Sequence, residues 1–206
     1  MSQVRRSSRT TYMMILSDLS LCHRQATTQI GKLIYMANKH YPFLVDYYSG
    51  VYKEQFVARA NDTSSATTVT NRIQKMPTVE ILGQTFISDA SRHSRASPFV
   101  SVVCLHHQER FLRPARVLYY LTYDVCRQGV FVKHTLAFVQ YYQPRQHHWS
   151  SYEAIDISGY NMQPAPLSKG CIAPVHCLYS TVSVFPLKID NCAAFVFLPR
   201  KIKAAC

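Results

Sequence analysis

The chain has 206 residues, of which 48% are hydrophobic, 12% aromatic and 17% charged. This composition excludes a disordered chain, which stays unfolded because it has few apolar residues, and the length suits one domain, alone or with a small satellite. The 23 Lys and Arg residues exceed the 11 Asp and Glu residues, and the resulting formal net charge of +12 favours polyanionic partners.

Membrane and secretory segments are the next classes that the sequence excludes. A membrane-spanning helix needs about 20 consecutive apolar residues, and the longest apolar candidate, residues 192–199, is much shorter. The apolar run at residues 12–16, behind the early arginines, is too short for a secretory signal. The early arginines fit a transit peptide and a basic arm that contacts nucleic acid equally well. We therefore expect a soluble, unsecreted chain with no membrane partner.

The seven cysteines form an odd set without the close pairs that are typical of a structural zinc site. In an unsecreted chain, this pattern favours buried thiols. A zinc site stays open only for one loose group, which consists of Cys171, His176, Cys177 and Cys192. We expect no cofactor.

Proline usage divides the chain into two parts. Residues 1–76 contain only Pro42, and the other nine of the ten prolines follow. Apolar residues recur at intervals of three or four over residues 12–37, which predicts a helix that Pro42 stops. This part is divided into a basic arm (1–10), a helical segment (11–60) and a Ser/Thr-rich linker (61–76).

The second part, residues 77–203, carries strand patterns. Residues 115–125 alternate between apolar and polar side chains, which places Val117 and Tyr119 on the same face of a half-buried strand. The turn at 127–129 leads to a second strand at 130–142. Further apolar runs lie at 79–87, 99–105, 171–175, 181–185 and 192–198. The sequence predicts an α+β fold, with an N-terminal helical segment followed by a mainly antiparallel β-barrel of about seven strands, whose closure removes exposed edges.

Three segments carry a family resemblance: HTLAFVQYYQP at 134–144, IAPVHCL at 172–178 and AFVFLPRKI at 194–202. Together they resemble strands of bromo-adjacent homology domains, and they are similar to uncharacterised open reading frames associated with mobile elements. Tyr141 stands where that family usually has Trp, and Leu178 replaces an Ile. The resemblance spans residues 77–202 and implies a β-barrel for protein or chromatin contacts without enzymatic activity.

Basic side chains are candidates for phosphate contact because the planar arginine fork matches phosphate. The alternative is an ordinary solvated surface. The candidate residues are Arg5, Arg6, Arg9, Arg92, Arg95, Arg110, Arg113, Arg116, Arg200, Lys201 and Lys203. Aromatic rings stack on bases or surround a cation, although they more often pack in a core. The aromatic candidates are Tyr119, Tyr142, Trp149 and Tyr152.

The strongest enzymatic constellation combines His107 and Arg110 with His134 and Tyr142. It is similar to the residue set of tyrosine recombinases, in which basic groups stabilise the phosphate that a tyrosine attacks. Those enzymes hold these residues on helices, whereas His134 and Tyr142 lie in a strand pattern here. The acids Asp89, Asp124, Glu153 and Asp156 form no diagnostic nuclease motif.

These observations predict a non-enzymatic module in the nucleus that binds nucleic acid or a chromatin protein and derives from a mobile element. One alternative is a protein-interaction barrel whose charge only keeps it in solution. The other is a strand-transfer enzyme of the tyrosine-recombinase type.

Overall fold

The computed structural model describes residues 26–28, 31–58, 67–91, 97–106, 109–127, 129–143, 157–161, 165–167, 171–186 and 192–197. These residues form mostly antiparallel strands and one α-helix, α2 (Tyr41–Tyr52). The strands are β1 (Ala26–Thr28), β2 (Lys32–Tyr35), β3 (Phe56–Ala58), β4 (Thr67–Val69), β5 (Arg72–Met76), β6 (Thr78–Ile81), β7 (Gln84–Ile87), β8 (Phe99–His106), β9 (Glu109–Arg127), β10 (Val130–Tyr141), β11 (Ile157–Asn161), β12 (Ile172–Pro174), β13 (Leu178–Pro186) and β14 (Cys192–Phe197). A short 3-10 helix, η1 (Val175–Cys177), joins β12 to β13.

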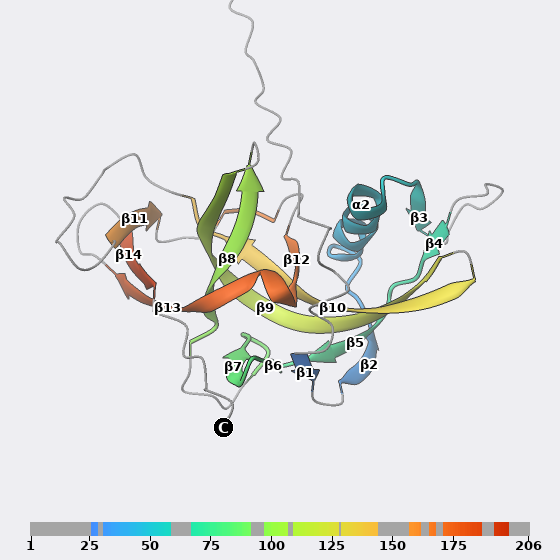
Figure 1. The fold of residues 1–206 in the computed structure, drawn as a ribbon, viewed down its shortest axis with the longest axis horizontal. Coiled ribbons are helices and arrows are strands. Elements are labelled where there is room, and N and C mark those ends of the chain that lie inside the picture. Colours follow the sequence, from blue (N-terminus) through green and yellow to red (C-terminus); the bar gives the residue numbers. More distant parts are fainter. Residues whose placement is uncertain are drawn as a thin grey trace, which may run out of the picture.

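The long β9–β10 hairpin is the centre of the fold (Figure 1). Its pairing runs from Arg127 opposite Val130 at the tip to Ala115 opposite Tyr141 at the base. Gly129 turns the chain at a φ of 78°, a backbone region that glycine enters without steric cost. The two strands and the turn predicted between residues 115 and 142 are confirmed.

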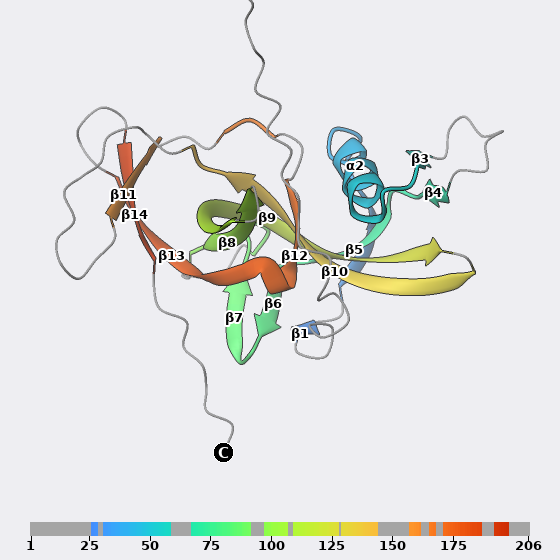
Figure 2. The same cartoon turned by 45° about the horizontal axis from the view of Figure 1, so that its top comes forward.

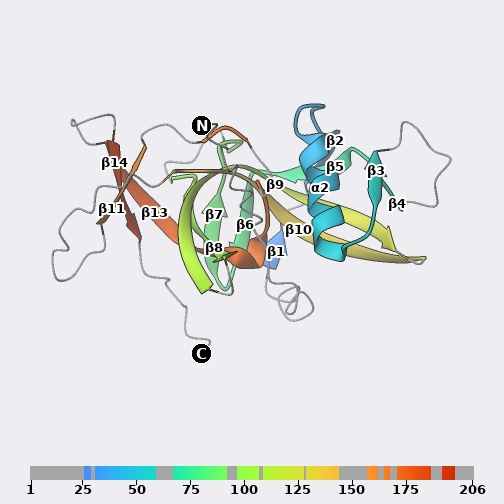
Figure 3. The same ribbon diagram turned by 90° about the horizontal axis from the view of Figure 1, so that it is seen from above.

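The expected closed barrel is wrong. The main sheet has the order β11-β14-β13-β8-β9-β10-β12, and no ladder between described residues joins its two ends. One edge of β9 pairs with β10, and the other is shared by β8 and then β5, with β2 outside β5. The sheet therefore branches along β9 instead of closing on itself. β11 and β14 lie at the end remote from α2 (Figure 3).

The helix predicted over residues 12–37 is also wrong where the structure describes it, although the predicted helical segment, 11–60, does contain α2. Residues 32–35, inside the helix expected over 12–37, form strand β2, which pairs with β5; residues 12–25 lie outside the described residues. The observed helix, α2, contains Pro42 in its first turn. Proline is tolerated there because the first N–H groups of a helix have no intrahelical partner.

Helix α2 packs on one face of the sheet, and the β1-β6-β7 sheet packs on the other (Figure 2). Beneath α2, Leu44 and Tyr48 bury their side chains against Tyr119 and Leu121 of β9. On the opposite face, Tyr120 packs with Met76 and with residues of β6 and β7. β9 thus contributes to two separate cores.

A bulge at Leu118 changes the predicted face pattern of β9. Tyr119 lies opposite Phe138 and Val117 lies opposite Val139, so Leu118 is an extra residue without a partner in this ladder. One extra residue reverses the alternation of side chains along a strand. Val117 therefore belongs to the core under β6 and β7, and Tyr119 to the core under α2, whereas the simple alternation predicts a shared face.

The predicted division after residue 76 falls at the end of β5 and separates this strand from its partner in the main sheet, β9. β5 comes from the predicted linker, and its Gln74, Lys75 and Met76 pair with β9. Val69 of β4 is buried in the core under α2. The two-part domain organisation stays a prediction.

Candidate nucleic-acid interface

The three predicted arginines on β9 have different surroundings. Arg110 is exposed near the start of the strand. The Arg113 guanidinium lies 4.6 Å from the ring centroid of Tyr141, and its Nε donates a hydrogen bond to the carbonyl oxygen of Tyr142 at 3.3 Å. Arg116 Nε lies 2.6 Å from Asp89 Oδ2 in an ion pair. The three arginines therefore do not form a single basic surface that is open to phosphate.

The two predicted ligand tyrosines that the structure describes are buried. Tyr119 stacks on Phe138 with the ring centroids 5.1 Å apart, and burial raises the pKa of Tyr119 above its ordinary value. Tyr142 packs against Phe195, at a centroid distance of 4.7 Å, and burial raises its pKa too. Both rings already have protein partners where a base or a methylated lysine would have to enter.

The remaining predicted site residues lie outside the described part of the chain. They are Arg5, Arg6, Arg9, Arg92, Arg95, Trp149, Tyr152, Arg200, Lys201 and Lys203.

The residues of the recombinase-like set that the structure describes are not brought together. Arg110 pairs with Leu105 near the start of β9, whereas His134 pairs with Tyr123 near the hairpin tip. His134 is buried beside α2, where its Nε2 lies 3.2 Å from the Tyr52 hydroxyl. Tyr142 is buried in a third core with Phe195, and His107 lies outside the described residues.

The described residues also do not form a metal site. Among the described residues, no group of three or more His, Cys, Asp or Glu side chains is placed to hold a metal ion. Asp89 pairs with Arg116, and Asp124 is exposed on β9. Burial raises the pKa of the Cys171 thiol to about 12, which favours the protonated form over the thiolate that zinc binds.

A surface that the sequence did not predict lies across strands β2, β5, β9 and β10. Their side chains alternate, so Ile34, Ile73 and Leu121 point toward α2. The side chains between them point to the opposite face of the sheet. There the β1-β6-β7 sheet covers Met76 and Tyr120, but it leaves uncovered the parts of the four strands that lie nearer the hairpin tip. The uncovered side chains form what we call the open face: Leu33, Tyr35, Arg72, Asp124, Phe131 and Lys133.

Two aromatic rings of the open face are far more exposed than aromatic side chains usually are. Tyr35 and Phe131 each keep 73% of their surface accessible, and Leu33 keeps 49%. Tyr35 lies directly opposite Arg72, and Lys133 lies two residues from Phe131 on the same strand. Each ring therefore has a cationic side chain beside it.

The centre of this region is held together by a polar contact. Thr122 Oγ1 donates a hydrogen bond to Gln74 Oε1 at 2.8 Å, which links β9 to β5. Thr122 is buried, and Leu33 lies opposite Gln74 on the other side of β5. This contact lies at the last pair of the β5–β9 ladder, so it joins the β2–β5 part of the open face to the β9–β10 part.

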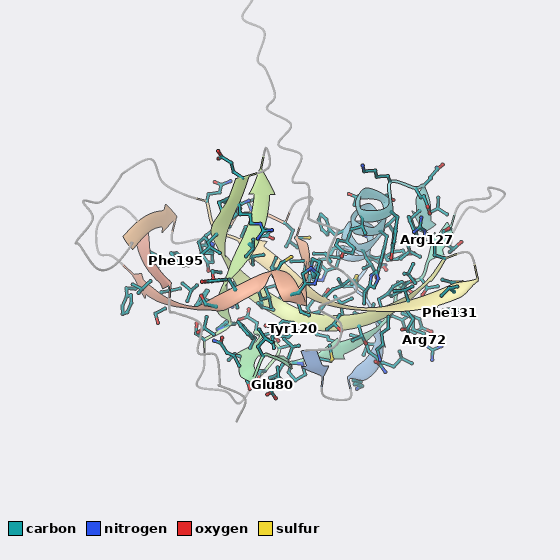
Figure 4. All side chains as sticks on the ribbon, viewed as in Figure 1. Arg72, Glu80, Tyr120, Arg127, Phe131 and Phe195 are labelled. Atoms are coloured by element: carbon teal, nitrogen blue, oxygen red, sulfur yellow. The ribbon has the colours of Figure 1, made fainter. Side chains whose placement is uncertain are left out.

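The other side of the hairpin is closed by contacts of its own. Arg127 forms an ion pair with Glu54, and its guanidinium lies 4.6 Å from the ring centroid of Tyr52 in α2. Lys75 Nζ lies 4.5 Å from the ring centroid of Tyr119. Figure 4 shows Arg127 on the side of α2, Arg72 on the opposite side, and Phe131 at the far end of the hairpin.

The only sequence signal for the open face is the four-residue segment that forms β2: Lys32, Leu33, Ile34 and Tyr35. A mixed segment this short fits a helix face as well as a strand. Only the pairing of β2 with β5 shows that Tyr35 points away from the core.

Comparisons with known proteins assign no family to the chain. No family model, no curated protein and no solved structure matches it. Among the residues that the structure describes, no helix is long and apolar enough to cross a membrane.

Proposed function

We propose that the chain is a non-enzymatic nucleic-acid-binding module and that the open face is its binding surface. The observation that carries this proposal is the pairing of exposed rings with cations: Tyr35 with Arg72, and Phe131 with Lys133. Nucleic acids offer both matching groups, since phosphates attract Arg and Lys and bases stack on aromatic rings.

The charge of the whole chain supports the same ligand class. A formal net charge of +12 raises the local concentration of polyanions around the protein before any specific contact forms. On the open face, Arg72 and Lys133 outnumber the acidic side chain of Asp124. A nuclear location and a chromatin partner belong to the proposal through the resemblance to bromo-adjacent homology domains.

The test is the salt dependence of binding by the full chain. A labelled oligonucleotide is titrated with protein at increasing salt, and phosphate contacts give a linear loss of log affinity with log salt. The double variant Arg72→Gln with Lys133→Gln should bind more weakly and with a shallower slope. The matched control is Lys39→Gln, because Lys39 is exposed but lies outside the open face. Binding without a salt slope, or equal losses in both variants, contradicts the proposal.

A second candidate function is protein interaction without nucleic acid. Among the described residues, β2 pairs only with β5, so its other edge offers unpaired backbone groups beside Leu33 and Tyr35. An extended peptide can add to such an edge as a further strand. Two results together would favour this candidate: the full chain binds a peptide but no oligonucleotide, and a proline substituted into β2 abolishes the peptide binding.

A further inference from the structure

We propose that the ligand of the open face is single-stranded nucleic acid, whose unpaired bases stack on Tyr35 and Phe131. This inference rests on the proposed function and adds to it the form of nucleic acid that the face selects. Three observations support it: the exposure of these two rings, the spacing between their strands, and the helix α2 that covers the other face of the hairpin.

Exposure singles out these two side chains. The described large apolar residues with high exposure are Leu33 at 49%, Tyr35 at 73%, Leu112 at 37%, Val130 at 62%, Phe131 at 73%, Tyr179 at 43% and Phe185 at 54%. The two highest values belong to the two aromatic rings of the open face. Elsewhere in the described chain, tyrosines such as Tyr48 and Tyr120 have no exposed surface.

The spacing of the rings fits separate bases. Tyr35 lies on β2 and Phe131 on β10, with β5 and β9 between them. Where the four strands are paired, three strand intervals of about 4.8 Å separate β2 from β10 by roughly 14 Å. One ring cannot replace the other at that distance, so each is a separate stacking platform with its own cation.

A duplex cannot stack its bases on the exposed rings of this surface. In double-stranded nucleic acid the faces of the bases are already stacked on one another, and only their edges are accessible in the grooves. A two-stranded β-ribbon can enter the major groove, but α2 covers the other face of this hairpin and Arg127 is already paired with Glu54. Open rings on a broad sheet are suited to unpaired bases, whose faces are free to stack.

The experiment compares one labelled 20-nucleotide oligonucleotide as a single strand and as a duplex, with the full chain at constant salt. We expect the single strand to bind at least tenfold more tightly. Tyr35→Ala and Phe131→Ala should each weaken single-strand binding by roughly 5- to 150-fold, the measured range for the loss of one stacked base. Duplex binding should change little.

Two matched variants test whether the ring itself is responsible. Tyr35→Phe keeps the ring and should bind the single strand as the unmodified protein does. Tyr179→Ala removes another exposed ring, 43% accessible on β13 and outside the open face, and should have no effect. Circular dichroism checks that the variants remain folded, which their exposed positions favour.

The outcomes separate the two proposals. If neither form of nucleic acid binds, the proposed function fails and this inference fails with it. If both forms bind equally and the ring variants bind normally, while loss of Arg72 and Lys133 weakens binding, the proposed function stands and the single-strand inference is overturned.

Discussion

His40 Nδ1 and the hydroxyl of Tyr119 lie 3.0 Å apart, which joins the residue before α2 to the centre of β9. The His40 ring also lies 4.5 Å from the ring of Phe138, centroid to centroid. This contact fixes the start of α2 on the sheet across 79 residues of sequence. It also makes the stability of that attachment depend on pH.

The first prediction follows from the charge state of His40. Burial first, and then the charges of Lys39 and Lys75, lower the pKa of His40. The unfolded chain therefore binds this proton more readily, so the stabilisation is complete above a pH of about 6.5 and is lost as the pH falls. Urea unfolding between pH 8 and pH 5 should show a decline in stability that His40→Asn reduces. An unchanged pH profile in the variant contradicts this assignment.

The hydroxyl of Tyr48 yields the second prediction. This side chain is fully buried, and within the described part of the chain its Oη has no hydrogen-bond partner. Because a buried polar group without a partner is unfavourable, Tyr48→Phe should leave the free energy of unfolding unchanged or raise it by about 1 kcal/mol. Tyr123→Phe is the contrast, since its hydroxyl accepts a hydrogen bond from the Thr70 N–H at 2.7 Å. That variant should lose about 0.5–1.5 kcal/mol, and equal losses in both would refute the difference.

Two glycines provide the third prediction. A Cβ on Gly31 would lie 2.7 Å from Met76 Cγ and 2.9 Å from the Lys75 carbonyl oxygen, whereas one on Gly50 would meet nothing within 4 Å. Gly31→Ala should therefore displace β2 and cost about 1–3 kcal/mol. Gly50→Ala, inside α2, should stabilise the protein by about 0.5–1 kcal/mol through helix propensity. Thermal unfolding of both variants measures the difference, which would be disproved by a stabilising Gly31→Ala.

The fourth prediction concerns the acidic side chain of the open face. Asp124 lies directly opposite Lys133 and competes with phosphate for its charge. Asp124→Asn should tighten oligonucleotide binding at low salt, and each additional phosphate that the variant neutralises should steepen the slope of log affinity against log salt by about 0.7. Glu80→Gln is the control, because Glu80 is exposed on β6 rather than on the open face (Figure 4). A variant that binds no better than the control would exclude competition by Asp124.

The sequence predicted the β9–β10 hairpin because the alternation at residues 115–125 and the turn residue Gly129 are local signals. It did not predict the bulge at Leu118, since a single extra residue is recognised only by the register of the partner strand. The helix over 12–37 failed at β2 for a related reason. The four residues of β2 are too few to distinguish the helical period of 3.6 residues from the strand period of 2. Only the pairing with β5, about 40 residues later, makes this segment a strand.

The candidate site was even less accessible to prediction from sequence. Arg113 and Arg116 form a cluster in sequence, but the structure places them with Tyr141 and Asp89 respectively. Tyr35 and Phe131 lie almost 100 residues apart and share a face only because β5 and β9 lie between their strands. Burial, which distinguishes a packing tyrosine from an exposed one, depends on these long-range pairings.

The membership of β9 in two cores has a consequence for how the molecule opens. Leu121 is packed under α2 and Tyr120 under β6 and β7, so the unfolding of β9 would disrupt both cores at once. The backbone amides of β9 should then exchange with deuterium only when the whole structure unfolds, at a common slow rate. A single cooperative transition is the expected behaviour, in which the loss of α2 and the loss of the β6–β7 hairpin are one event.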